Sequence, residues 1–232
     1  MARFTRRLSQ LANCLFAVSA VATRWDVGNG AARVGAARTK CRQKNETPSL
    51  LIGDSMCAKN TDTADKDTKG YCWYKATNGI KRHLVVDVLG NPYFVVCTKA
   101  SVSDDDGLLA IIKRHKEYFL QLPSEHRLTI LLDNGYHKDY LEQQLEQING
   151  SLRERIAIEL SAKITPQQKA VSKQEKPAKQ GFVVIKKRWI VERTNAWLNQ
   201  CRALWKNCEG LLRTSEAKIR ICAIRLILRR LA

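Results

Sequence analysis

The chain of 232 residues has the length of one good-sized domain with a short appendage. Its 40 Lys and Arg residues outnumber its 22 Asp and Glu residues, so the net charge is +18. A charge this positive favours a polyanionic partner such as nucleic acid, and a ribosomal or membrane-surface protein is the alternative. No run of residues is long and apolar enough to span a bilayer, so we expect no membrane-spanning helix.

The eight cysteines do not have the spacing of metal ligands. They form no C-x-x-C pair, and no His lies at zinc-finger spacing from them. We expect all eight to be reduced thiols of a cytosolic protein. Cys201 and Cys208 fall on the apolar stripe of a predicted helix and should be small core residues.

Residues 1–44 are predicted to be a divergent N-terminal segment or linker ahead of a domain that spans 45–232. The segment begins with the basic MARFTRRLSQ and the short apolar run LANCLFAVSAVA, for which a signal peptide and a short helix are the two interpretations. Residues 31–44 are rich in Ala, Arg and Lys, which is typical of a linker or of an arm that faces DNA.

The first part of the domain is predicted to consist mainly of strands. The apolar run at 49–55 predicts a strand, and the polar stretch at 56–79 predicts a solvated turn. Two β-rich runs, at 81–89 and 93–99, flank the sequence GNP and predict a hairpin. Asp87 stands beside this turn, where an Asp commonly bonds to nearby backbone.

Helices and strands alternate in the rest of the domain. The sequence SDDDG predicts the start of a helix, and its acids are interpreted as helix caps rather than metal ligands. The very apolar run at 128–132 predicts a central strand, and a helix follows from His137. A strand at 155–160 and a basic loop at 161–180 come next. This order predicts an α/β fold in which a mixed, five-stranded sheet has helices on both faces.

Two helices are predicted near the C-terminus. The first extends from Arg188 to about residue 208 and has a largely apolar stripe of Ile190, Thr194, Trp197, Cys201, Leu204 and Cys208. Gly210 separates it from the last helix, which is predicted to turn inward Ile221, Ile224, Leu228 and Leu231. The outer side and end of the last helix are predicted to carry Arg220, Arg225, Arg229 and Arg230.

Three acids are candidates for a shared divalent metal site. Asp54 and Asp133 each end an apolar strand, at the edge of the sheet where α/β proteins bind ligands. Glu192 lies on the predicted helix, away from its apolar stripe and among basic neighbours. The alternative for Glu192 is a solvated acid that pairs with Arg188, four residues before it.

Several segments together resemble the small bacterial insertion-sequence transposases of the DDE class, in the insertion-sequence-five group. The segments that carry the resemblance are LIGDS, GIKRHLVVDVLG, SVSDDDG, LLDNGY, KRWIVERTNAWLNQCR and SEAKIRICAIRLILRR. Two features depart from the family pattern. Gly53 stands where the family usually has an aliphatic residue, and residues 1–44 do not resemble the N-terminal helical region that helps to recognise transposon ends.

The resemblance implies an RNase-H-like fold and a site for two Mg²⁺ ions, with Mn²⁺ as a substitute. Carried over by position, the catalytic and metal-binding acids are Asp54, Asp133 and Glu192. Arg188 matches the basic residue four positions before the Glu, Asn199 stands where a lysine is expected, and Arg202 is the candidate replacement. The DNA-binding residues implied are Lys187, Arg188, Arg193 and Arg202. Trp189 is a candidate to stack on an unpaired base, and Trp197 belongs to the apolar stripe.

The implied function is that of a DNA transposase, which cleaves strands at the ends of its element and joins them to target DNA. The implied setting is a homo-oligomer on DNA in the prokaryotic cytoplasm, associated with the nucleoid. One alternative is a catalytically inactive DNA-binding fragment that competes with an intact transposase. Another is a structure-specific nuclease of the same fold, which cleaves strands but does not join them.

Overall fold

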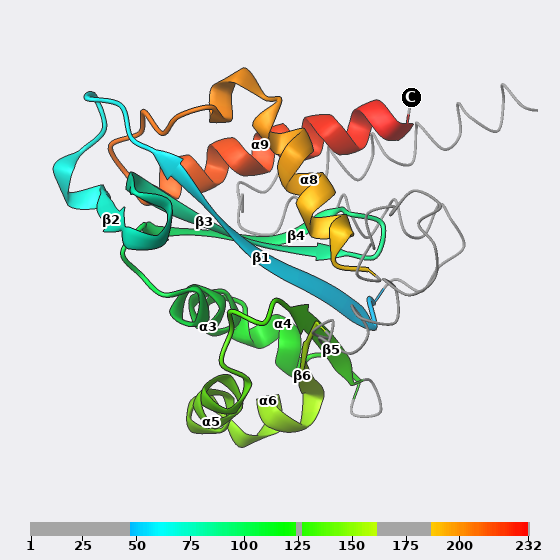
Figure 1. Cartoon of the computed structure of the whole chain (residues 1–232). Helices are drawn as coiled ribbons and strands as arrows, with labels where there is room; N and C mark the ends of the chain where they lie inside the picture. The colour runs from blue at the N-terminus through cyan, green and yellow to red at the C-terminus, as the bar shows by residue number, and fades with distance from the viewer. Residues whose placement is uncertain (1–46, 124–126, 162–186, 232) are drawn as a thin grey trace, which may run out of the picture.

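The computed structural model describes residues 47–123, 127–161 and 187–231. The predicted N-terminal segment and the predicted basic loop, apart from residue 161, lie outside these residues. Figure 1 shows a sheet with helices on both faces. Its strands are β1 (Leu50–Lys59), β2 (Gly70–Cys72), β3 (Thr77–Asp87), β4 (Pro92–Lys99), β5 (Leu128–Leu132) and β6 (Ile156–Leu160).

The strands form one mixed, six-stranded sheet in the order β2-β3-β1-β5-β6, with β4 also paired to β3. β1 and β4 are antiparallel to β3, whereas β1, β5 and β6 run parallel. The predicted α/β class with a mixed sheet is confirmed, and the fold is RNase-H-like. The prediction of a solvated turn at 56–79 was wrong, because β1 continues to Lys59 and β2 pairs with the start of β3. Short 3-10 helices, η1 (Lys66–Thr68) and η2 (Trp73–Lys75), flank β2.

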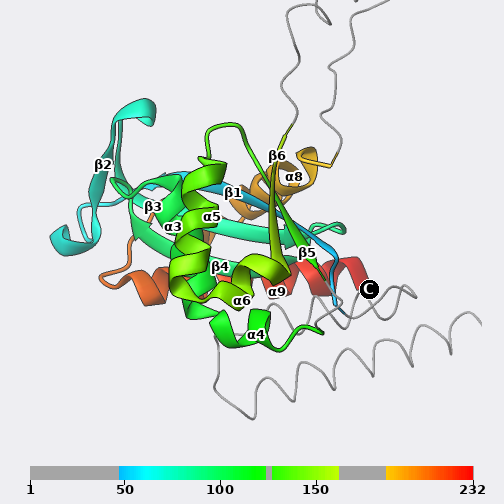
Figure 2. The ribbon, with the colours of Figure 1, turned by 90° about the horizontal axis from the view of Figure 1, so that it is seen from below.

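Two groups of helices cover the two faces of the sheet. One face carries α3 (Asp104–Arg114), α4 (Lys116–Leu120), α5 (Lys138–Ile148) and α6 (Gly150–Arg155), and Figure 2 shows these helices from below with the strands behind them. The other face carries α8 (Trp189–Asn199) and α9 (Leu212–Leu231). Successive residues of a strand point to opposite faces, so Leu51 packs in the core of the first group and Ile52 in the core of the second. Among the described helices, none is long and apolar enough to cross a membrane.

The predicted hairpin is confirmed, and Asp87 shapes its turn. The carboxylate Oδ1 of Asp87 accepts hydrogen bonds from the backbone N–H groups of Leu89 and Asn91, each at 2.8 Å. The helix start at SDDDG is also confirmed, with the hydroxyl of Ser103 accepting from the backbone N–H of Asp106 at 3.0 Å. Local polar residues thus fix the β3-β4 turn and the start of α3, as their sequence predicted.

The helix predicted from Arg188 to about residue 208 is shorter than expected. α8 ends at Asn199, and a 3-10 helix, η3 (Arg202–Leu204), follows it. The chain leaves the helix to reach the end of β1, where the backbone N–H of Asn207 donates to the carbonyl of Lys59 at 2.8 Å. Cys208 is exposed, contrary to the prediction, whereas Cys201 is buried. The buried face of α8 consists of Ile190, Val191, Thr194, Asn195 and Leu198.

The inward face predicted for α9 was wrong. Ile221, predicted to be buried, is 64 % exposed. The apolar residues that α9 buries are Ile219, Cys222, Ala223 and Ile227. The helix is therefore rotated about its axis relative to the prediction, and some positions on the side predicted to face solvent are buried.

Two charged residues of α9 explain this rotation, because they bond to β4. Glu216 accepts a hydrogen bond from the backbone N–H of Cys97 at 2.9 Å, and Arg220 donates to the carbonyl of Val95 at 3.2 Å. β4 pairs only with β3 in the described sheet, so its free edge offers these backbone groups. Arg220 is consequently buried and does not lie on the outer side of the helix, where it was predicted.

Replacing Gly107 with Ala should destabilise the fold, although the same change inside a helix usually stabilises by about 1 kcal/mol. A Cβ at this position would lie 1.9 Å from the imidazole Cε1 of buried His83. We expect a loss of about 1–3 kcal/mol in the free energy of unfolding, as for an overpacked core. Denaturant unfolding measures it, with Gly150→Ala as the control because its Cβ meets nothing within 4 Å. Equal stability of the Gly107 variant and the parent would contradict this account.

Candidate active site

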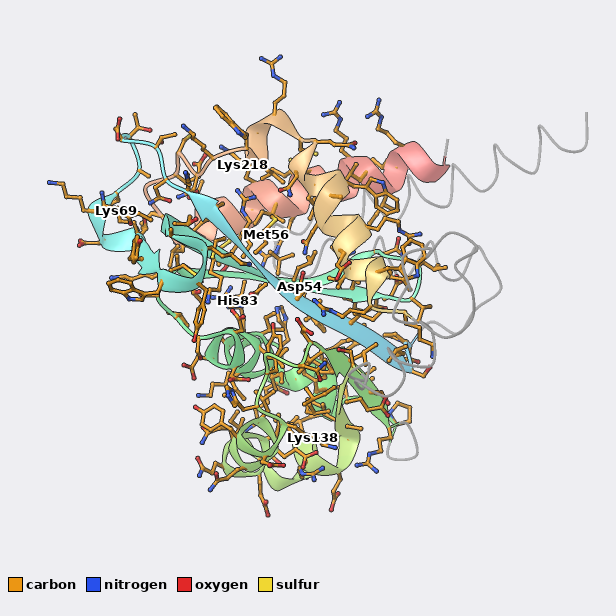
Figure 3. The ribbon with its side chains drawn as sticks, viewed as in Figure 1. Asp54, Met56, Lys69, His83, Lys138 and Lys218 are labelled. Carbon is orange, nitrogen blue, oxygen red and sulfur yellow. The ribbon has the colours of Figure 1, made fainter. Side chains whose placement is uncertain are left out.

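Asp54 and Asp133 lie where two parallel strands separate. The last paired residues of β1 and β5 are Ile52 and Leu131, and each acid stands two residues beyond its member of this pair. Two steps along a strand return the side chain to the same face, here the face that packs against α8 and α9. Figure 3 shows Asp54 near the middle of β1 and close to α8. The two strand acids therefore stand at the same level on neighbouring strands.

Gly53, the departure from the family pattern in β1, fits the close packing of these strands. A Cβ at Gly53 would lie 2.7 Å from the Cδ2 atom of Leu132. An aliphatic side chain would therefore push against the residue that precedes Asp133. The glycine allows the chain segments that carry the two acids to lie close together.

Helix α8 brings the third acid to the strand acids through Arg188. The guanidinium of Arg188 contacts Asp133 with Nη1 to Oδ1 at 2.5 Å, and it contacts Glu192 with Nη2 to Oε1 at 3.5 Å. Arg188 and Glu192 are four residues apart and share one face of the helix. The pairing expected for a solvated Glu192 is thus present, but the same arginine also holds Asp133. Glu192 therefore lies in the neighbourhood of the strand acids.

Asn195 completes the connection between α8 and β1, and the sequence analysis did not identify it. Its side-chain Nδ2 donates a hydrogen bond to Oδ2 of Asp54 at 2.9 Å. Asn195 stands seven residues after Arg188, two helical turns further along the same face. This spacing was a signal that could have placed Asn195 in the site.

The three carboxylates differ in their exposure to water. The side chains of Asp133 and Glu192 are 39 % and 50 % exposed. Burial raises the pKa of Asp54 above its usual value, and the charge of Glu192 adds to this rise. The positive charges of Arg188 and Lys75 and a backbone hydrogen bond from Ser55 act in the opposite direction. Asp54 is therefore a desolvated carboxyl group whose ionised form a nearby cation would favour.

The chemistry of this group of acids fits a hard divalent cation. All three side chains offer carboxylate oxygens, the ligands that Mg²⁺ prefers. In the described ranges, no group of three or more His, Cys, Asp or Glu side chains is already arranged around a metal position. Arg188 instead supplies the positive charge between Asp133 and Glu192. A metal ion at these oxygens would compete with Arg188 for the carboxylates.

The basic residues predicted to bind DNA have different surroundings. Arg193 lies between two indole rings, with its Cζ atom 4.3 Å from the ring centre of Trp189 and 4.5 Å from that of Trp197. It also donates to the carbonyl of Leu89 at 3.2 Å, so it joins α8 to the hairpin. Trp189 therefore has Arg193 against one face. The exposed residues Lys187 and Arg202 lie at the two ends of the α8 region.

Replacing Asp54 with Asn should raise the melting temperature at neutral pH. The pKa of Asp54 is higher in the folded chain than in the unfolded chain, so its carboxyl group costs stability as the pH rises through that range. A neutral amide of the same shape removes this cost and can still accept from Asn195. Thermal unfolding should show the largest gain near pH 7 and a smaller gain near pH 4. Asp62→Asn, at an exposed position, is the control, and a gain of equal size in it would refute the explanation.

Comparisons with known proteins identify the family of the chain. Residues 45–227 match the family described as the transposase DDE domain. A curated relative, the putative transposase for insertion sequence element IS402 of Burkholderia cepacia, is 29 % identical over 136 residues, which cover 56 % of this chain and 54 % of the relative. The chain thus spans about half the length of this relative. No solved structure shows a significant match. On the family match over most of its length, the chain belongs to the family of transposase DDE domains.

Proposed function

We propose that the chain cleaves DNA strands at the ends of an insertion element and joins them to target DNA, with Asp54, Asp133 and Glu192 as the catalytic acids. The observation that supports this role is the convergence of two strand acids and one helix acid on Arg188 and Asn195. Long stretches of sequence separate the acids, so only the fold can bring them together. If Glu192 were only a solvated acid on a helix face, it would not need two strand acids beside it, so the grouping favours a functional role.

The three carboxylates are the proposed ligands of a divalent metal pair. Two Mg²⁺ ions, or Mn²⁺ ions in their place, would stabilise the charge on the attacking and leaving oxygens of a phosphodiester. Asp54 is proposed to contact both ions, with Asp133 and Glu192 each contacting one. Asn195 orients Asp54, since it holds one oxygen of that carboxylate.

Arg188 is proposed to exchange its carboxylates for a DNA phosphate. Its guanidinium can bind two oxygens of one phosphate, as it now contacts oxygens of two carboxylates. Lys187 and Arg202 are proposed to contact the phosphate backbone without reading sequence. The role of Arg193 is to support α8, because two indole rings and a carbonyl group already surround it.

DNA is the proposed partner, and the charge of the chain supports it. A net charge of +18 attracts the phosphate backbone whatever the sequence. Joining two element ends requires two active sites near one another, so a homo-oligomer assembled on DNA is part of the proposal. Such a protein would act on the nucleoid of its cell.

One observation favours the alternative, a DNA-binding protein without catalysis that competes with an intact transposase. Arg188 contacts both Asp133 and Glu192. A chain that kept these pairs in the presence of DNA and metal would bind the substrate without cleaving it.

A plasmid assay separates these functions. We expect the chain to convert supercoiled plasmid that carries the element ends to nicked circles with Mg²⁺ but not with EDTA. A pre-cut end offered with target DNA should then be joined to it. Binding without nicking would support the competitor, and nicking without joining would support a nuclease. Binding with neither activity in Mg²⁺ or Mn²⁺ would overturn the proposed catalysis.

A further inference from the structure

A pocket lies beyond the acids, between the end of β1 and the chain segment that follows α8. Its volume is about 250 Å³. It is lined by Cys57, Ala58, Lys59, Thr77, Arg82, Asn199, Leu204, Trp205 and Lys206. Three of these residues are cationic, and within the described part of the chain no carboxylate lines the pocket. The pocket therefore has a positive lining without an internal counter-charge.

Arg82 is the most unusual residue of this lining. It is only 6 % exposed, and its Nη2 donates to the carbonyl of Leu204 at 2.9 Å. Its Nε is buried without a hydrogen-bond partner, and the described residues place no acid in an ion pair with it. Buried charges in proteins are normally paired, because a charged group that leaves water without a partner loses its hydration uncompensated. An anion in the pocket would supply the missing partner.

Trp205 adds a flat apolar surface beside these cations. Its side chain is 74 % exposed, which is unusual for the largest aromatic residue. The Nζ atom of Lys206 lies 4.7 Å from the centre of one of its rings. An exposed indole next to a cationic pocket is the combination that binds single-stranded nucleic acid, where bases stack on aromatic rings and cations contact phosphates.

The pocket lies on a direct path from the acids. Ala58 and Lys59 follow Asp54 by four and five residues on β1, which is about 13–17 Å at the rise of a strand. On α8, Asn199 stands one turn after Asn195, and its Nδ2 lies 3.3 Å from the Sδ of Met56. β1 and α8 thus border the whole path, and Figure 3 shows Asp54 and Met56 in succession along it. A single strand that follows this path therefore extends over a few nucleotides between the acids and the pocket.

We propose that this pocket binds one phosphate of a single DNA strand, a few nucleotides from the phosphodiester at the acids, with an unpaired base stacked on Trp205. Arg82 and Lys59 hold the phosphate, and Lys206 steadies the indole. The inference deepens the proposed function, because it names where the strand next to the cleavage site is held. It does not depend on cleavage, since binding needs neither metal nor intact acids.

Binding of fluorescent oligo(dT) to the full chain in EDTA tests the proposal. Trp205→Leu should weaken binding about tenfold, the loss expected for one stacked base. Lys59→Gln should weaken it and lower the slope of log affinity against log salt by about 0.7, the value for one phosphate contact on a single strand. A duplex of the same length should lose much less affinity in the Trp205 variant, because its bases are already stacked.

Matched substitutions elsewhere serve as controls. Trp73 is another exposed tryptophan and Lys113 is an exposed lysine on α3, on the opposite face of the sheet. Trp73→Leu and Lys113→Gln should leave binding of oligo(dT) near the parent value. Thymidine monophosphate should compete poorly, since it offers one base and no strand; competition equal to that of the strand would contradict the proposal. Equal losses in the Trp73 and Trp205 variants would contradict it as well.

The failure of this inference and the failure of the proposed function give different results. If Mg²⁺-dependent nicking is present while the Trp205 and Lys59 variants bind as the parent does, the pocket is not a strand site and the transposase proposal stands. If nicking is absent while these variants bind weakly, the strand site stands and the catalytic proposal fails.

Discussion

Replacing Asp133 with Asn should reduce Mg²⁺-dependent nicking of supercoiled plasmid by about 10³-fold or more. The change removes one negative ligand from the proposed metal pair, whose charge stabilisation amounts to several kcal/mol, and each 1.36 kcal/mol corresponds to tenfold in rate. Asp54→Asn should have a loss of at least the same size, because Asp54 is proposed to contact both ions. Gel analysis of nicked and supercoiled forms over time measures both rates.

The loss should be chemical and not a loss of folding. Asp133→Asn removes one charged contact of Arg188, but the side chain is partly exposed, so the melting temperature should change little. The Asp54 variant should even melt at a higher temperature than the parent, for the reason given above. Asp62→Asn should nick at the parent rate. Nicking by Asp133→Asn at more than about a tenth of the parent rate would remove Asp133 from the proposed metal site.

The approximate position of the strand acids could be predicted from local sequence, but Asp54 does not end its strand as predicted, because β1 continues to Lys59. Asp54 and Asp133 each follow a run of apolar residues that forms a strand on its own pattern, and parallel strands bring such residues to one level. Asp87 and Ser103 were predictable for the same reason, since their hydrogen bonds reach only two to four residues along the chain. Structural features that depend on contacts within a few residues of the chain can therefore be predicted from the sequence.

The features that could not be predicted depend on contacts between distant segments. The rotation of α9 follows from bonds of Glu216 and Arg220 to the edge of β4, more than a hundred residues away. The apolar pattern of the helix carries no sign of this edge. The early end of α8 likewise follows from the contact of Asn207 with the end of β1. The cationic pocket arises from that same contact, because it brings Trp205 and Lys206 to Lys59 and Arg82.

Arg188 connects the predictable and unpredictable parts of the site. The sequence indicated its pairing with Glu192, four residues later, but not its shorter contact with Asp133. A single guanidinium therefore neutralises two of the acids and offsets part of the rise that burial causes in the pKa of the third, Asp54. Arg188 thus occupies the carboxylates that the proposed metal ions would bind, and the proposed exchange for a phosphate would free them.

Replacing Arg188 with Met should change metal binding and DNA cleavage in opposite directions. Without the guanidinium, Asp133 and Glu192 lose the cation that pairs with both of them in the described part of the chain, so Mn²⁺ should bind the DNA-free chain about tenfold more tightly, which corresponds to about 1.4 kcal/mol. Nicking should nevertheless fall by about 10²-fold at saturating metal, the loss expected when one charge-stabilising donor is removed from a reacting phosphate. Calorimetric titration with Mn²⁺ and the plasmid assay measure the two effects on one preparation.

Two further variants make this prediction specific to the guanidinium. Arg188→Lys keeps the charge but cannot bind two oxygens in one plane, so it should recover metal affinity near the parent value and only part of the nicking rate. Arg127→Met removes an exposed arginine at the opposite end of β5 and should change neither quantity. If Arg188→Met weakened both metal binding and nicking, the arginine would be organising the acids for the metal. The exchange of Arg188 between the carboxylates and a phosphate would then be refuted.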